Sequence, residues 1–196
     1  MAKPAGLVRE AGTISLMALV LLAATGAAAE PCVAPDQLKP TNIKQSFVQE
    51  RKFASLPKPL VSEGNVAIDQ DSIVWTTTSP FKLRMTLSKD GMTQSVEDGP
   101  DEPMNMGGDI SAVIVRVTSA LVRARWDELA TFFNVAAAQQ PGGSWKVTLD
   151  PKSGSFAALL GKVEVTGCHA VSEVSITRSN GDHESIRFSG GPGAIQ

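Results

Sequence analysis

The chain has 196 residues with 18 basic and 20 acidic side chains, and its formal net charge is −2. The basic residues are scattered and form no run, which excludes a polyanion such as a nucleic acid as the expected partner. The length allows one domain with a sizeable core, and 42% of the residues are apolar.

The first 29 residues have the pattern of a cleaved secretory signal peptide. Lys3 and Arg9 form a positive start, an apolar run follows over residues 14–24, and three alanines at 27–29 supply the small residues of a cleavage site. The apolar run is shorter than the roughly 20 residues that span a bilayer, which argues against the alternative of a retained membrane anchor. Residues 30–196 are therefore expected to be the exported protein, a single domain.

The only two cysteines, Cys32 and Cys168, lie near opposite ends of this expected domain. Lipidation of Cys32 is not expected, because Glu30 and Pro31 precede it where small uncharged residues are needed. In an oxidising compartment an even number of cysteines favours a disulfide over the alternative of two buried thiols. Closing a loop of this length stabilises a domain by about 4–5 kcal/mol in the chain-entropy model.

The first part of the chain predicts short β-strands separated by turns, after a short helix within 33–44. The clearest strand is 81–87, where apolar residues at odd positions alternate with polar residues at even positions, so that one face is apolar and the other lies in water. Lys89-Asp90-Gly91 then turns the chain back on itself. The expected strands are 47–51, 60–68, 73–78, 81–87 and 92–96.

Helices are expected in the middle of the chain, after a loop over 97–108 that is rich in proline and glycine. Apolar residues recur at helical spacing over 110–121, with Asp109 as N-cap, and a second helical segment includes Trp126. The β-branched residues between Val113 and Val117 leave a strand there as the alternative. One further helical turn is expected at 155–161. Strands return at 132–138, 145–150, 163–167, 171–178 and 185–188. Together these strands and two or three helices predict one α+β domain.

Catalytic chemistry has little support in the sequence. No motif of a nucleophilic hydrolase, a zinc protease, a P-loop or a dinucleotide site is present. His169 and His183 lie in no motif, and the acidic loop residues Asp98, Asp101 and Glu102 are explained by a solvated turn more readily than by a metal site. No enzyme activity, metal or cofactor is expected.

The strands predict a sheet with one apolar face, which the helices over 110–130 are expected to cover. Such an arrangement holds either a packed core or a cavity lined by aromatic and methionine side chains. Periodicity does not distinguish a filled sheet from a hollow one, and both interpretations stay open at this point.

An ordered series of short motifs resembles the outer-membrane lipoprotein carrier (LolA-like) family over most of residues 40–190. The motifs are 47–51 (FVQER), 59–64 (PLVSEG), 73–75 (IVW), 79–81 (SPF), 129–133, 145–149 (WKVTL) and 180–182 (NGD). This resemblance implies an incomplete, strongly curved antiparallel β-barrel with a helical lid over a hydrophobic cavity. It also implies a soluble periplasmic chaperone that shields the acyl chains of a lipoprotein between an inner-membrane releasing complex and an outer-membrane acceptor.

One departure separates this chain from the best-studied family members, which carry a functional arginine a few residues after the glycine that matches Gly64. Here that neighbourhood is Asp69-Gln70-Asp71, and Arg84, on the polar face of its strand, is no obvious substitute. The resemblance therefore indicates a divergent branch, whose cargo is a lipoprotein or another lipid such as a glycolipid.

The expectation is a monomeric, non-enzymatic carrier of acylated cargo. A protein-binding or regulatory module on the same fold remains the alternative. The residues expected to line the lipid cavity are Val66, Ile68, Trp75, Phe81, Leu83, Met85, Leu87, Leu121, Trp126 and Phe133.

Overall fold

A computed structural model describes residues 31–39, 43–68, 72–104, 108–152, 157 and 160–190. The chain from Pro31 onward forms one compact unit, and the predicted signal peptide lies outside the described residues. Within the described residues no helix is both long and apolar enough to cross a membrane.

Eleven antiparallel strands form one sheet in the order β6-β5-β4-β3-β2-β1-β11-β10-β9-β8-β7. The sheet is open, because the edge strands β6 and β7 do not pair with each other. The strands are β1 (Ile43–Lys52), β2 (Leu60–Ile68), β3 (Ser72–Ser79), β4 (Leu83–Ser88), β5 (Gly91–Val96), β6 (Glu102–Pro103), β7 (Phe133–Gln139), β8 (Trp145–Pro151), β9 (Lys162–Gly167), β10 (Val171–Thr177) and β11 (His183–Ser189).

The sheet consists of two meanders, which we call the N-terminal half-sheet (β1 to β6) and the C-terminal half-sheet (β7 to β11). Within each, strands that follow one another in the chain pair with one another, as short hairpin connections favour. The halves meet where the first and last strands pair, with Phe47 opposite Phe188 and Gln49 opposite Ile186. The two outer edges are therefore consecutive in the chain, and their connection has to cross the sheet.

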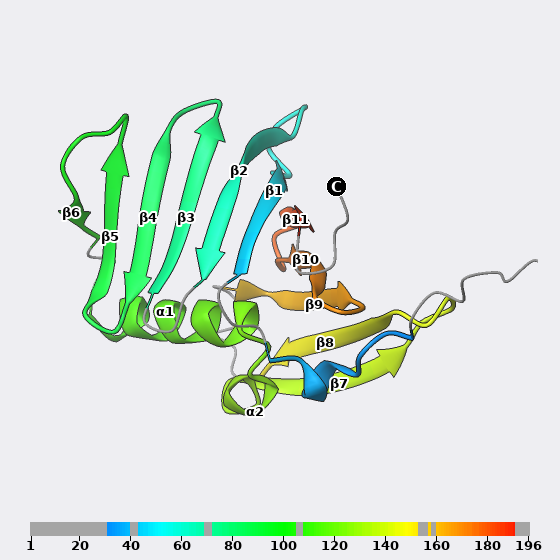
Figure 1. Cartoon of the computed structure of the whole chain (residues 1–196). Helices are drawn as coiled ribbons and strands as arrows, with labels where there is room; N and C mark the ends of the chain where they lie inside the picture. The colour runs from blue at the N-terminus through cyan, green and yellow to red at the C-terminus, as the bar shows by residue number, and fades with distance from the viewer. Residues whose placement is uncertain are drawn as a thin grey trace, which may run out of the picture. The chain divides into compact units, whose positions relative to one another are not determined.

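Helices occupy this crossing connection. The described part contains α1 (Gly108–Val122) and α2 (Trp126–Leu129), and Figure 1 shows α1 running across the ends of the strands of the N-terminal half-sheet. With a rise of about 1.5 Å per residue, α1 is about 22 Å long. Its Val117 and Ala120 pack into the core of the C-terminal half-sheet, while Val122 packs against that of the N-terminal half-sheet. The helix thus contacts both halves.

Two apolar clusters form the core, one in each half-sheet. The larger, here called the C-terminal core, includes Trp145, Val147 and Leu149 of β8 with their cross-strand partners Val163 and Val165 of β9. The smaller, the N-terminal core, consists of Val66, Ile68, Ile73, Leu87 and Met92. In both, side chains two positions apart along a strand point to the same face, as the alternating pattern predicts.

The N-terminal segment is fastened to the C-terminal half-sheet. A disulfide joins Cys32 to Cys168 in the β9–β10 turn, which confirms the predicted pairing. The indole N–H of Trp126 donates a 2.7 Å hydrogen bond to the carbonyl of Pro35, within the short 3₁₀ helix Pro35–Gln37. The Trp145 indole donates to the carbonyl of Cys168. These contacts hold the segment beside the C-terminal core.

The predicted and observed elements differ in identifiable places. The described residues contain eleven strands, ten of which correspond to expected ones, and the additional β6 has only two residues within a proline-rich loop. The helix expected within 33–44 is limited to one 3₁₀ turn, because β1 already begins at Ile43. Of the turn expected at 155–161, most residues lie outside the described ones.

Candidate functional site

The inner face of the sheet, which is the face that α1 packs against, carries the apolar residues of each strand. On the N-terminal half-sheet these form cross-strand rows, one of which runs Ile68–Ile73–Leu87–Met92 and is buried next to α1. The outer face carries residues such as Arg84, which pairs with Asp101 at 2.9 Å. This ion pair raises the pKa of the Arg84 guanidinium, chiefly through the hydrogen bond to that carboxylate.

Three aromatic rings meet where the two half-sheets join. The rings of Phe47 and Trp75 have centroids 4.2 Å apart, and Phe188 meets Trp75 edge-on at 6.1 Å. Gly64 lies between them on β2, opposite Phe47 on one side and Thr77 on the other. A Cβ on Gly64 would lie 1.9 Å from the carbonyl oxygen of Thr76, so only glycine allows β3 to approach this closely.

Beyond α1 the apolar inner face continues without full cover. Trp75, Leu83 and Met85 are half-buried, and Val96 at the end of β5 is 55% exposed. Leu83 pairs with Val96 across β4 and β5, so these side chains form a continuous apolar strip. The strip extends the N-terminal core toward the strand ends remote from α1.

A buried polar network lies on the same face in the central strands. The side-chain amide of Gln49, a residue that is 5% exposed, donates a 2.5 Å hydrogen bond to Glu184, and the Ser62 hydroxyl donates to the side-chain Oε1 of Gln49. Arg51 and Arg178 each approach the Glu184 carboxylate at 3.5 Å. The carboxylate is thus neutralised and hydrogen-bonded, as a buried charge requires. On the side of the central strands, the apolar strip ends at this polar network.

A small cavity lies between α1 and the central strands. It is lined by Gln45, Val66, Ile68, Leu121, Val122, Val171, Val174 and Phe188. Its volume is about 10 Å³, which is at the lower limit for a single water molecule. The helix and the sheet are therefore in close contact here.

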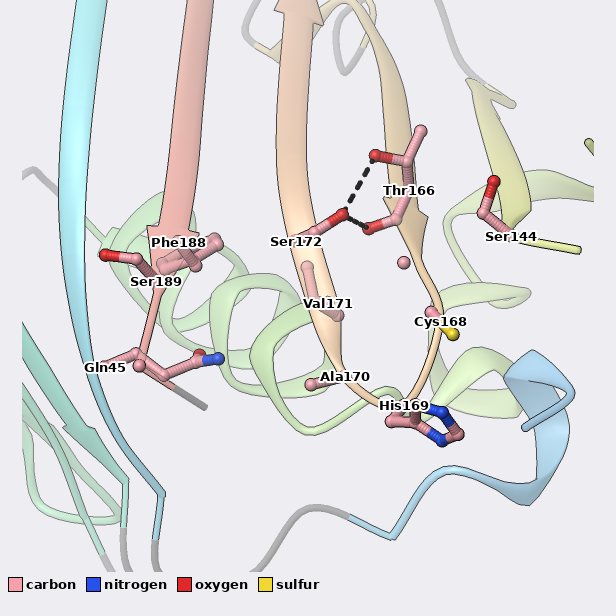
Figure 2. Close-up of a pocket in the computed structure, with 12 residues that line it drawn as sticks. Gln45, Ser144, Thr166, Cys168, His169, Ala170, Val171, Ser172, Phe188 and Ser189 are labelled. Atoms are coloured by element: carbon pink, nitrogen blue, oxygen red, sulfur yellow. Dashed lines mark hydrogen bonds between the residues drawn. The ribbon is translucent and has the colours of Figure 1, made fainter. Parts of the chain in front are cut away.

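A larger groove opens beside the β9–β10 turn. It has a volume of about 320 Å³, within the range of small-molecule sites, and Figure 2 shows its lining residues. Ser172 contributes a hydroxyl that is hydrogen-bonded to Thr166, and His169 lies exposed at the rim next to the disulfide. Phe188, Val171 and Gln45 line both the groove and the small cavity.

The ten residues expected to line a lipid cavity fall into three groups. Val66, Ile68 and Leu87 are buried in the N-terminal core, with Trp75 and Met85 partly buried against it and Leu83 half-buried on the neighbouring row. Three others, Leu121, Trp126 and Phe133, belong to the C-terminal core or pack on it. Phe81 lies apart in the turn before β4 and is 73% exposed.

Sequence reasoning missed several residues of this face. Phe47 and Phe188 complete the aromatic group, and Gln45 lines both hollow regions. Period-two alternation along β1 places Gln45 and Phe47 on one face, and that signal is readable from residue 45 onward. The pairing of β1 with β11, which brings Phe188 to them, has no local signal.

The titratable groups considered for chemistry have ordinary structural partners. Asp98 pairs with Lys82, and His183 lies exposed on the outer face with its ring nitrogens near the Thr177 and Ser175 hydroxyls. Among the described residues no group of three or more His, Cys, Asp or Glu side chains is placed to hold a metal ion.

The solved structures similar to this chain include two with names that describe a family. One is a LolA superfamily protein from Nitrosomonas europaea, with 6% sequence identity and a TM-score of 0.41, covering 83% of this chain and 91% of the other. The second is a DUF1329 family protein from Desulfovibrio piger, with 9% identity and a TM-score of 0.42, covering 83% of this chain and 90% of the other. No family model and no curated protein matches the sequence.

The first of these structures carries the name of the family that the ordered sequence motifs resemble. With TM-scores below 0.5, the two likenesses carry no argument about activity.

Proposed function

We propose that the protein is a periplasmic carrier that binds the acyl chains of a lipoprotein or another lipid on the inner face of the N-terminal half-sheet. The observation that carries this proposal is the half-buried apolar strip of Trp75, Met85 and Leu83, which continues the N-terminal core beyond the cover of α1. Uncovered apolar surface that is continuous with a core favours an apolar ligand.

Loading requires the helix and the sheet to separate, because the cavity between Leu121, Val122 and the central strands has a volume of only about 10 Å³. In this proposal α1 acts as a lid. Each methylene taken out of water contributes about 0.8 kcal/mol, so a long acyl chain offsets the contacts that a few α1 side chains lose. Since the same contacts re-form on release, the carrier is able to hand its cargo on.

The remaining features of the proposal concern location and partners. A cleaved signal peptide at 1–29 leaves residues 30–196 as one carrier domain, and the Cys32–Cys168 disulfide suits an oxidising compartment such as the periplasm. An inner-membrane releasing complex and an outer-membrane acceptor are the proposed partners of a monomeric carrier. The proposal includes no catalytic step.

A titration with a fluorescent fatty acid or lipopeptide tests the carrier. We expect saturable binding at micromolar protein, weakened about tenfold or more by Met85→Gln, which places a polar group on the strip. Thr86→Gln is the matched control, since Thr86 is the next residue of β4 and points to the outer face. Absence of saturable binding would contradict the proposal, and so would equal effects of the two substitutions.

A second candidate function, a protein-binding module, is favoured by a specific observation. Among the described residues, the most exposed large apolar side chains lie at the strand ends and in the connecting loops of the N-terminal half-sheet that are remote from α1. They are Leu56, Leu60, Val61, Phe81 and Val96. An exposed apolar edge beside a packed interior suits a protein partner. Loss of function in Phe81→Ser with unchanged binding of fatty acid would favour this candidate.

A further inference from the structure

The ladder between β10 and β11 ends before the strands do. Its last pair is Glu173 with Arg187, although β11 continues to Ser189 and β10 begins at Val171. Beyond this pair β11 stays with β1 through Phe47–Phe188, and β10 follows β9 after a register shift between Val171 and Glu173. The two strands therefore diverge, and the 320 Å³ groove lies where they part.

The described residues that line the groove contribute neutral polar groups and no acidic, lysine or arginine side chain. Hydroxyls come from Ser144, Thr166, Ser172 and Ser189, and an amide comes from Gln45. His169 is the only titratable side chain among its lining residues, and it is exposed. A carboxylate or phosphate placed here would lose hydration without gaining a counter-charge, so the lining favours an uncharged ligand group.

Gln45 connects the groove with the interior. It is only 9% exposed, and its side chain makes no hydrogen bond to the described residues. No side-chain nitrogen or oxygen that is fully buried in the described part lacks a partner, so the Gln45 amide must reach the hollow space that it lines. Figure 2 shows this side chain pointing from β1 toward the space between β11 and β10. An amide that is open only to the groove, on a side chain that is otherwise buried, is available to hydrogen-bond a ligand bound there.

We propose that this groove is the headgroup site and access route of a single-chain acyl lipid whose headgroup is uncharged. The glyceryl, ester or amide group lies against Gln45 and the hydroxyls, and the acyl chain passes between Val171 and Phe188 into the cavity below Leu121 of α1. The continuity of lining residues between groove and cavity carries this assignment. This assignment rests on the proposed carrier function, and it adds the chemical class of the headgroup and the route by which the acyl chain enters.

Three fluorescent probes with the same acyl chain test the headgroup class. They are added to the purified exported protein, which contains the whole domain from residue 30 to residue 196. They are a monoacylglycerol, the free fatty acid and the lysophosphatidic acid. We expect the monoacylglycerol to bind about tenfold more tightly than either anionic probe, because only its headgroup enters the groove without losing charge hydration. Tighter binding of either anionic probe would overturn the uncharged headgroup.

Two substitutions test the route. Ser172→Trp fills the groove from an exposed position and is expected to weaken binding of every probe about tenfold, whereas Ser179→Trp, in the exposed turn at the other end of β10, leaves binding unchanged. Gln45→Leu removes the amide at similar volume, and we expect it to abolish the preference for monoacylglycerol. Circular dichroism and urea unfolding verify that each variant is folded.

The failures of the two proposals are distinguishable. If the wild-type protein binds the probes saturably and both Ser172→Trp and Gln45→Leu bind them as the wild type does, the groove is not the route while the carrier function stands. If the wild type binds none of the three probes, the carrier function and the groove assignment both fall.

Discussion

The two half-sheets belong to one sheet and have the same alternation of apolar and polar residues, yet their inner faces are covered to different extents. In the C-terminal half-sheet Trp145, Val147, Leu149, Val163 and Val165 are each at most 3% exposed. Parts of α1, α2 and the disulfide-linked N-terminal segment pack against that half. In the N-terminal half-sheet the described cover, α1, reaches only one end, and the strip from Trp75 to Val96 stays partly open.

This difference indicates that the C-terminal half-sheet contributes mainly to stability and the N-terminal half-sheet offers surface for binding. A closed core gains free energy from every buried side chain and tolerates little change in volume. A partly open apolar face contributes less to folding, because its side chains stay in contact with water, and it keeps surface available for a ligand. We therefore expect substitutions in the two halves to differ in what they damage.

The largest expected effect comes from Trp145→Ala in the C-terminal core. Trp145 is 1% exposed, packs edge-on against Trp126 and bonds to the Cys168 carbonyl, so its removal should lower the free energy of unfolding by about 3–5 kcal/mol. Met85→Ala, on the open strip, should cost about 1–2 kcal/mol, because the side chain is only half-buried. Urea unfolding measures both, and equal losses would remove the distinction between the halves.

The disulfide provides the next largest effect. Replacing Cys32 and Cys168 together by serine should lower the free energy of unfolding by about 2–5 kcal/mol, since the bridge closes a loop between residues 136 positions apart. The measurement is thermal unfolding with and without a reductant. A reductant should lower the Tm of the wild type and leave that of the double variant unchanged; an equal Tm in wild type and variant would show that the bridge does not stabilise the domain.

The smallest expected effect concerns Asp182, which connects the two halves through their loops. Its carboxylate accepts the backbone N–H of Ala54 at 3.0 Å and the amide of Asn180 at 2.9 Å. These bonds, with that of Ala54 the larger cause, lower the pKa of Asp182 below its ordinary value of 3.8. A carboxylate whose pKa is lowered on folding stabilises the fold above its unfolded pKa, and this contribution disappears as the pH falls through the folded pKa.

Asp182→Asn should therefore reduce the Tm slightly at neutral pH, and the difference from the wild type should vanish at a pH below the folded pKa of the carboxyl. Asp150→Asn is the control, because Asp150 is an exposed carboxylate on β8 without a side-chain partner in the described part of the chain. Thermal unfolding across pH gives the result. If the Tm difference between Asp182→Asn and the wild type did not change with pH, the negative charge of Asp182 would not be the cause of the stabilisation.

Comparison of sequence and structure shows which features are local. The strand 60–68 is predicted with the bounds of β2, and the helix expected at 110–121 lies within α1, because alternation and helical spacing act over a few residues. The strand expected at 81–87 begins only at Leu83, which leaves Phe81 in an exposed turn. Alternation alone does not show where a strand begins. Phe81 continues the alternating pattern of β4, but it lies before the first residue that pairs with a neighbouring strand.

The candidate site was predictable only in part, for a related reason. Val66, Ile68 and Leu121 all line the small cavity, as an apolar inner face implies. Gln45 was not predicted as a lining residue, because a glutamine within an alternating strand does not by itself indicate burial. Its position depends on Phe188 and Val171, which lie more than 120 residues further along the chain.

Local sequence is sufficient to predict the short strands, the face on which their apolar side chains lie and the two cysteines available for pairing, because each follows from composition or spacing over a few residues. Only the tertiary structure decided that β1 pairs with β11, that the helices cross the sheet and cover one half more fully than the other, and that β10 and β11 diverge into a groove. Those outcomes depend on contacts between residues far apart in the chain, whose free energies are gained only when the whole sheet assembles.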